Sequence, residues 1–173
     1  MMRTNTTWQH SAEATADFQD SCYRLAPKRK ALDAKESEVT VGTGQWALPA
    51  TLTMPVGPGP VPAVVLVHGS GPGDRDATVG QIKQFKDLAL GLASRVIAVL
   101  RYDKRTRVHA NLMRELPGLT VKDETIDDAI AAVQVLRSTP GVDPNRIVVL
   151  GHSLGGMLVP RIAAAGPRLP ASS

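Results

Sequence analysis

The sequence predicts an α/β fold with a mostly parallel sheet and an antiparallel hairpin before it. Short runs of β-branched and apolar residues recur along the chain, as in strands buried on both faces. Segments with apolar residues at helical spacing separate these runs, and a stretch of period-two alternation precedes them. Because alternating strands and helices favour parallel pairing, these three observations define the fold class.

The first elements form a hairpin and a strand–helix–strand unit. Apolar and polar residues alternate between Glu38 and Met54, and glycines and a proline interrupt the middle of this stretch, which predicts two antiparallel strands. The run Ala63–Val67 predicts a strand buried on both faces. Apolar spacing then predicts a helix over Gln81–Ser94, and Val96–Leu100 predicts the next buried strand.

The second half of the chain repeats this alternation. A helix begins near Lys122, where acidic residues interact favourably with the helix dipole, and it ends before Pro140-Gly141. The run Ile147–Leu150 predicts a third buried strand. A last helix is expected over Ser153–Ala165, closed by Gly166-Pro167.

Composition and charge narrow the classes of function. The 173 residues include 43% hydrophobic and 21% charged residues, as in a globular protein. The net charge is +4, but the chain has only two Trp, two Tyr and two Phe, too few aromatic rings for stacking on bases, so no nucleic-acid partner is expected. The longest apolar run, Val61–Val67, is far shorter than the roughly 18 residues of a membrane span.

The N-terminal region and the cysteine content bear on location and domain organisation. The first residues lack the apolar stretch of a signal peptide, and Cys22 has no partner for an internal disulfide, so we expect a cytoplasmic protein with no membrane contact. Residues 1–36 are polar and form a lead segment, with one helix expected over Ser11–Leu25. The folded domain is predicted to span residues 37–173.

The chemistry is predicted by residues 151–155, Gly-His-Ser-Leu-Gly, which match G-x-S-x-G. A predicted buried strand precedes this motif and a predicted helix follows it, which is the context that a nucleophile elbow requires. Gly151 and Gly155 leave room for the sharp turn, and the turn would expose the Ser153 hydroxyl at the start of the helix. The alternative is a glycine-rich connection with an incidental serine.

A second glycine-rich turn follows the first parallel strand. Its sequence, His68-Gly69-Ser70-Gly71, would let backbone approach a ligand closely. Together HGSGPGDRD (68–76), RYDKR (101–105) and GHSLGG (151–156) resemble the α/β-hydrolase superfamily, in particular bacterial esterases and acyl hydrolases related to dienelactone hydrolases, serine aminopeptidases and acyl-thioester hydrolases. The resemblance covers roughly residues 38–166.

This resemblance implies roles for individual residues. Ser153 would be the nucleophile, and the backbone N–H groups of Ser70 and Leu154 would form the oxyanion hole. Gly69, Gly71, Gly151 and Gly155 would be the glycines of the two motifs. The resemblance gives no catalytic role to His68 or His152, so both are expected to be structural. Asp74, Arg75 and Asp76 would lie near the mouth of the site, but a surface turn is the favoured interpretation, and Asp103 is expected to hold a loop.

The family's catalytic acid and base are expected after the nucleophile. The twenty residues after Ser153 contain no Asp, Glu or His, so the chain resembles the N-terminal portion of a hydrolase and lacks the C-terminal strands. Removal of the triad histidine costs about 10⁶ in kcat. His109 is the remaining internal candidate for a base.

Two readings of the function follow. The leading one is a serine hydrolase that acts on a small carboxylic ester or thioester; the other is a non-catalytic remnant or interaction module of the same fold. No cofactor is implied, and the histidines and Cys22 show no metal-ligand spacing. Without a further strand beside it, Ile147–Leu150 would be an apolar sheet edge, so we expect pairing with a second copy or with a complementary fragment there.

Overall fold

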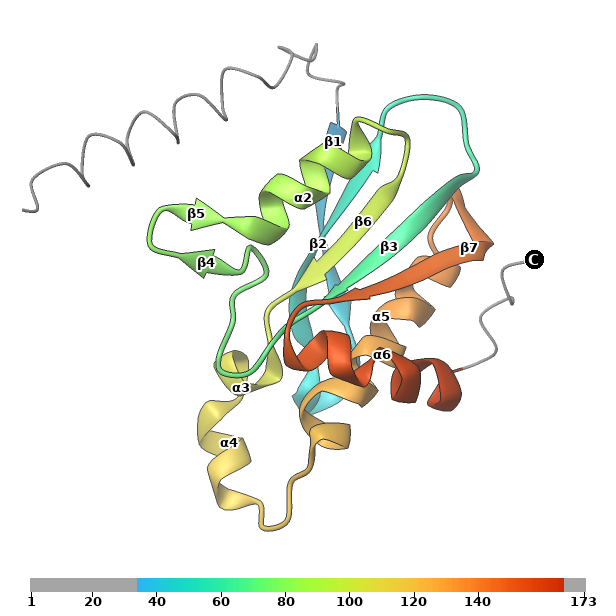
Figure 1. Cartoon of the computed structure of the whole chain (residues 1–173). Coiled ribbons are helices and arrows are strands. Elements are labelled where there is room, and N and C mark those ends of the chain that lie inside the picture. Colours follow the sequence, from blue (N-terminus) through green and yellow to red (C-terminus); the bar gives the residue numbers. More distant parts are fainter. Residues whose placement is uncertain (1–33, 167–173) are drawn as a thin grey trace, which may run out of the picture. The chain divides into compact units, whose positions relative to one another are not determined.

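The computed structural model describes residues 34–166, in which a five-stranded mixed sheet is the central element (Figure 1). Its strands, in sheet order, are β1 (Ala34–Val41), β2 (Leu48–Pro55), β6 (Ala98–Tyr102), β3 (Val61–Val67) and β7 (Val142–Gly151). The helix expected over Ser11–Leu25 lies outside the described residues, as does the lead segment up to residue 33.

Strand direction agrees with the predicted fold class. β6, β3 and β7 are parallel, whereas β1 and β2 form an antiparallel hairpin and β2 pairs antiparallel with β6. A short 3₁₀ turn, η1 (Gly44–Trp46), lies within the hairpin connection. Gly42 and Gly44 adopt φ angles of 77° and 61° there, a region that favours glycine. The chain therefore has an α/β fold with an antiparallel hairpin beside three parallel strands.

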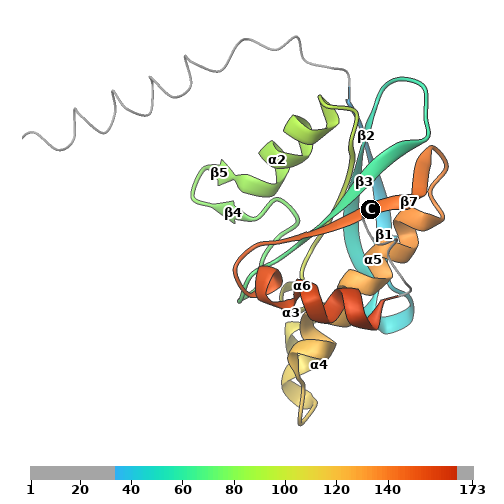
Figure 2. The same ribbon diagram turned by 45° about the vertical axis from the view of Figure 1, so that its right-hand side comes forward.

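Helices cover both faces of the sheet (Figures 1 and 2). The longer ones are α2 (Gln84–Ala93), α5 (Asp127–Arg137) and α6 (Leu154–Ala165). α2 packs on one face and α5 and α6 pack on the other. The shorter helical segments are α3 (Arg105–Val108), α4 (Ala110–Glu115) and the π-helical turn η2 (Lys122–Ile126). No helix within residues 34–166 is long and apolar enough to cross a membrane.

β3 lies at the centre of the core. Val64 and Leu66 pack against Phe85 and Ala89 of α2, whereas Val65 points to the opposite face, into the cluster formed with α5 and α6. Alternate residues of a strand point to opposite faces, so a strand covered on both sides is apolar throughout. This is the physical basis of the continuous apolar run in the sequence.

β7 differs from the predicted buried strand in one respect, because it lies at the edge of the sheet. Ile147 is buried and Val149 packs against the α5–α6 side. On the α2 side, Val148 is 58% exposed and Leu150 is 38% exposed. Within residues 34–166 no other strand pairs with β7 beyond β3, so the expected open apolar edge is present.

Several predicted boundaries are wrong. The strand predicted from Ile147 begins at Val142, and β1 begins at Ala34, within the predicted lead segment of residues 1–36. The helix expected from Gln81 begins at Gln84, because the preceding residues form a small hairpin of β4 (Thr78–Val79) and β5 (Ile82–Lys83), with Gly80 at φ 61° in its turn. The strand expected from Val96 begins at Ala98. Val96 instead adopts φ 64° in the turn that ends α2, where it is 48% exposed.

Candidate active site

The turn between β7 and α6, called the elbow below, is sharp and has a strained backbone at Ser153. Ser153 adopts φ 50° and ψ −118°, which a non-glycine residue rarely does. A Cβ atom on Gly151 would lie 2.3 Å from the carbonyl carbon of Gly155, and one on Gly155 would lie 2.5 Å from the carbonyl oxygens of Val67 and His68. Both positions are too close to backbone for any side chain, so the two glycines make the turn possible.

The glycine-rich loop after β3 passes directly beside this elbow. A Cβ atom on Gly69 would lie 3.1 Å from the Cβ of Ser153, and the N–H of His152 donates to the Val67 carbonyl at 2.9 Å. Within the described part of the chain, no hydrogen bond uses the backbone N–H of Ser70 or of Leu154. The structure therefore brings Ser153 next to the loop that carries two of the predicted motif residues, Gly69 and Ser70.

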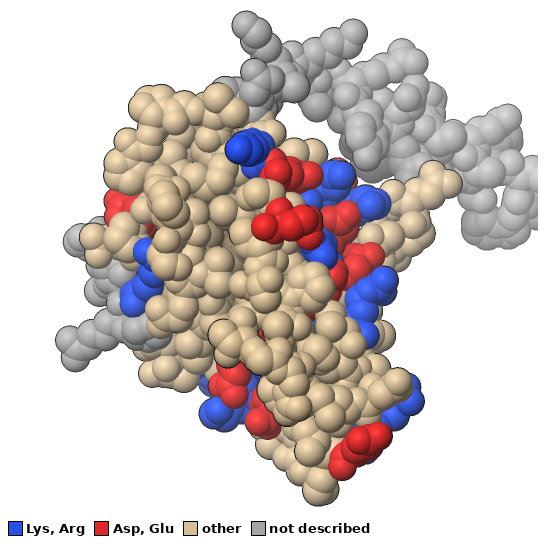
Figure 3. Space-filling model, turned by 180° about the vertical axis from the view of Figure 1, so that it is seen from behind, with Lys and Arg blue, Asp and Glu red and all other residues tan. Residues whose placement is uncertain are grey.

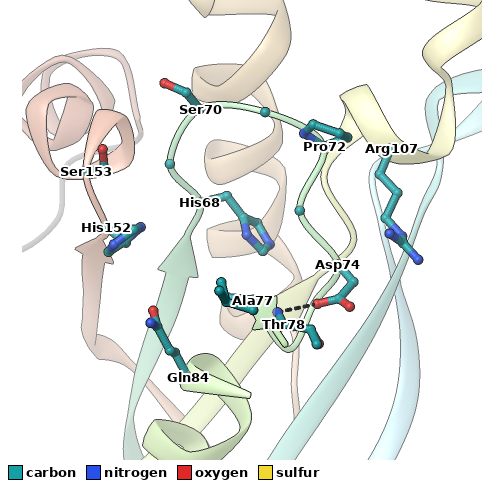
Figure 4. Close-up of a pocket in the computed structure, with 14 residues that line it drawn as sticks. His68, Ser70, Pro72, Asp74, Ala77, Thr78, Gln84, Arg107, His152 and Ser153 are labelled. Carbon is teal, nitrogen blue, oxygen red and sulfur yellow. Dashed lines mark hydrogen bonds between the residues drawn. The ribbon is translucent and has the colours of Figure 1, made fainter. Parts of the chain in front are cut away.

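The loop and the elbow line a common cavity of about 360 Å³ (Figure 4). Ser70, Gly71, His152 and Ser153 contribute to its wall. The β4–β5 hairpin and the start of α2 contribute Thr78, Val79 and Gln84, and α3 contributes Arg107. None of these four residues was predicted to belong to the site, because no motif includes them and only the fold brings them to the cavity.

His68 also lines this cavity, but its ring is hydrogen-bonded and packed within the protein. Its side chain is buried, its Nε2 donates to the carbonyl oxygen of Tyr102 at 2.7 Å, and its ring packs on Phe85. Gly73 passes so close that a Cβ there would lie 2.8 Å from the His68 Nδ1. Burial lowers the pKa of His68 below its ordinary value. A neutral, structural histidine fits this environment.

His109, the internal candidate for a base, lies elsewhere. Its Nε2 donates to the carbonyl oxygen of Ala47 at 3.0 Å, and its ring meets Trp46 edge to face. It is not among the residues that line the cavity of Ser153. The guanidinium of Arg105 lies 4.7 Å from the centroid of the same Trp46 ring and binds the carboxylate of Asp128. Burial raises the pKa of Asp128.

The residues after the glycines of the loop are held by ion pairs. Arg75 binds Asp103 through its backbone N–H at 2.7 Å and through its guanidinium at 3.1 Å, and it also binds Glu38. Asp103 thus holds a loop, as expected. Of the predicted surface turn, only Asp74 lines the cavity, whereas Arg75 and Asp76 turn toward the sheet.

A second set of ion pairs continues this network across the sheet. Arg101 of β6, whose side chain is only 3% exposed, binds Glu36 of β1 at 2.7 Å and Asp76 at 3.1 Å. Burial opposes ionisation of Asp76, but hydrogen bonds from Lys83 and Arg101 outweigh it and hold the pKa of this carboxyl below its ordinary value. Seen from behind, acidic and basic side chains are interleaved rather than segregated (Figure 3).

A sharp strand–serine–helix turn, set on a parallel strand beside a glycine-rich loop, is the site architecture of an α/β hydrolase. The model of the alpha/beta hydrolase family matches residues 64–172, and the chain belongs to this family. It is 51% identical over 129 residues to Esterase EstD of Thermotoga maritima, which covers 75% of this chain and 29% of that protein.

Solved structures share the fold at lower sequence identity. A dienelactone hydrolase from Anabaena variabilis matches 76% of this chain and 57% of its own, with 22% identity and a TM-score of 0.59. Brefeldin A esterase matches 87% of this chain and 41% of its own, with 24% identity and a TM-score of 0.58. Bacterial heroin esterase matches 88% and 45%, with 23% identity and a TM-score of 0.54. The chain thus spans between two fifths and three fifths of these proteins.

Proposed function

We propose that this chain carries the nucleophile and the oxyanion hole of a serine hydrolase that acts on small carboxylic esters or thioesters. The strained backbone of Ser153 is the observation that carries the proposal. A φ of 50° at a non-glycine residue costs free energy, and such strain is found where a side chain must be presented in one direction. Relatives that are esterases by name support the ester as the bond that is cleaved.

The proposed reaction begins with attack of the Ser153 Oγ on the carbonyl carbon of the substrate. The hydroxyl proton passes to a base, and negative charge develops on the carbonyl oxygen, which would accept hydrogen bonds from the N–H groups of Ser70 and Leu154. Collapse of this intermediate breaks the C–O or C–S bond, and the alcohol or thiol leaves with the proton. Water then hydrolyses the acyl-serine by the same steps.

We propose that the base and the acid come from outside residues 1–173. Residues 154–173 contain no Asp, Glu or His. Among the described residues, the histidines at the cavity are His68, which is buried against Tyr102, and His152, which belongs to the elbow itself. Both acylation and deacylation would therefore be slow in this chain alone, by as much as about 10⁶ relative to a complete triad.

The experiment is acylation by p-nitrophenyl acetate, followed by intact mass and peptide mapping. Because deacylation also needs a base, we expect one acetyl group to accumulate on Ser153 with little turnover. Ser153→Ala should abolish this adduct. Ser138→Ala, which removes an exposed hydroxyl at the end of α5, should leave it unchanged. An adduct that persists in Ser153→Ala would contradict the proposal.

A second candidate function is strand pairing along β7. The observation that favours it is the edge position of β7, with Val148 58% exposed on the α2 side. We propose that residues 147–150 pair with a second copy of the chain. Light scattering at increasing concentration should show dimers, and Val148→Lys should shift them to monomers; a wild-type chain that stays monomeric would contradict this pairing.

A further inference from the structure

Lys104, just after β6, has an unusual environment for a lysine. Its side chain is 2% exposed, and its Nζ donates to the carbonyl oxygen of Gly69 at 2.8 Å and forms an ion pair with Glu124. Its backbone N–H donates to the carbonyl of Gly73 at 3.0 Å. A buried ammonium is costly unless it is paired and hydrogen-bonded. One residue thus contacts both ends of the glycine-rich loop.

The contact with Gly69 has a geometric consequence for Ser70. The carbonyl of Gly69 and the N–H of Ser70 belong to the same planar peptide unit, which is trans, so they point in opposite directions. Fixing the carbonyl toward Lys104 therefore fixes the N–H on the side away from Lys104. That N–H makes no hydrogen bond within residues 34–166, and Ser70 lines the cavity beside Ser153 whereas Lys104 does not.

The loop's own backbone does little to fix the orientation of the Gly69–Ser70 peptide. Gly69 and Gly71 flank Ser70, and Gly71 has a φ of 86°, so the backbone on both sides can adopt several conformations. The end of β6 and the segment after it supply the missing constraints: Tyr102 accepts from His68, Lys104 donates to Gly69, and the Thr106 hydroxyl donates to the Gly71 carbonyl at 3.1 Å. Figure 4 shows the loop running from His68 past Ser70 toward Asp74.

We propose that Lys104 is a positioning residue for the oxyanion hole. Its ammonium orients the Gly69–Ser70 peptide so that the Ser70 N–H faces the developing oxyanion. The positive charge on the carbonyl side also polarises the peptide and strengthens the N–H as a donor. This inference rests on the proposed function, because it assumes that Ser70 and Ser153 act on the same substrate carbonyl.

The test compares Lys104→Met with Glu124→Gln in the full chain. Lys104→Met keeps the length of the side chain but removes the donor, whereas Glu124→Gln removes the charge of the ion-pair partner and leaves the ammonium on Gly69. The first readout is the residual dipolar coupling of the Ser70 N–H, which reports its orientation. The second is the rate constant for phosphonylation of Ser153 by a fluorophosphonate, measured separately from the affinity for the probe.

We expect Lys104→Met to change the Ser70 coupling and to lower the phosphonylation rate constant about 10- to 100-fold, short of the loss of a whole oxyanion donor. Affinity for the probe should stay within about twofold, and Glu124→Gln should keep both the coupling and the rate even where it lowers the melting temperature. A merely structural lysine would instead give equal effects in the two variants, in proportion to stability, and that result would overturn the inference.

Two further outcomes are separable. If the fluorophosphonate labels a residue other than Ser153, the proposed function fails, and the Ser70 coupling alone decides the role of Lys104. If Lys104→Met does not fold, a scalar coupling across the hydrogen bond between the Lys104 Nζ and the Gly69 carbonyl carbon of the wild type takes its place. Absence of that coupling would overturn the inference.

Discussion

Gly155→Ala is expected to damage both stability and reactivity, because α6 lies directly on β3 at this glycine. The added Cβ would meet the carbonyl oxygens of Val67 and His68 at 2.5 Å, and real Cβ contacts are essentially never under 3.0 Å. Both contacts are backbone atoms and cannot rotate away. The start of α6 must therefore move from β3 by roughly 0.5 to 1 Å, a shift typical of an overpacked core.

The magnitude follows from this displacement. Overpacking of a well-filled interior costs about 1–3 kcal/mol of unfolding free energy. The same movement carries Ser153, which immediately precedes α6, away from the glycine-rich loop. A misplacement of about 1 Å at a reacting group can cost about 10² in rate. We therefore expect both a lower urea midpoint and a phosphonylation rate at least about tenfold lower.

The matched control is Gly91→Ala in α2. A Cβ atom there meets nothing within 4 Å, and the residue lies inside a helix. Alanine should raise the unfolding free energy by about 0.5–1 kcal/mol because it lowers the entropy of the unfolded chain. Urea unfolding and the labelling rate are measured for both variants. A Gly155→Ala chain with wild-type stability and reactivity would refute the close packing of α6 on β3.

Three other perturbations follow from the same contacts. Arg101→Met leaves the carboxylates of Glu36 and Asp76 without their shared buried partner, so we expect thermal unfolding to show a loss of about 3 kcal/mol; a loss under about 0.5 kcal/mol would contradict the network. Ser70→Ala keeps the backbone N–H, so acetylation of Ser153 should stay within about threefold, and a larger drop would indicate a role for the hydroxyl. The pKa of His68 is lower in the folded state than its ordinary value of 6.5. As the pH falls below 6.5, the unfolded state therefore binds protons first, and the free energy of unfolding should decrease until the pH reaches the folded-state pKa of His68. His68→Asn should remove this part of the pH dependence in urea unfolding at pH 7.5 and 5.5, and an unchanged dependence would exclude His68 as its source.

Local patterns predicted the elements that carry the proposed chemistry. The run Ala63–Val67 is apolar because β3 is covered on both faces, and the motif around Ser153 is local because its glycines pack on one another and on β3. Such features are visible in the sequence because the residue type at each position is set by the backbone geometry of its own segment or by complete burial. The edge of β7 was also predictable, since it depends only on which strands are present.

Long-range side-chain contacts were not predictable from the sequence. Glu36 and Glu38 alternate along β1 in the way that a solvated strand would, and nothing local indicates that they bind Arg101 and Arg75. Lys104 lies in a basic run that is typical of an exposed loop, yet its side chain is buried because it pairs with Glu124 and with the Gly69 carbonyl. The position of Lys104 between a buried strand and a helix is the sequence signal that could have indicated that its side chain is buried.

The most direct test of the central claim is treatment of the full chain with a fluorophosphonate probe, followed by peptide mapping of the labelled residue. Because the base is supplied from outside this chain, we expect slow labelling, of one phosphonyl group per chain at most, on the peptide that contains Ser153 and none in Ser153→Ala. A label on another residue of the folded chain, or a label that persists in Ser153→Ala, would contradict the assignment of Ser153 as the nucleophile.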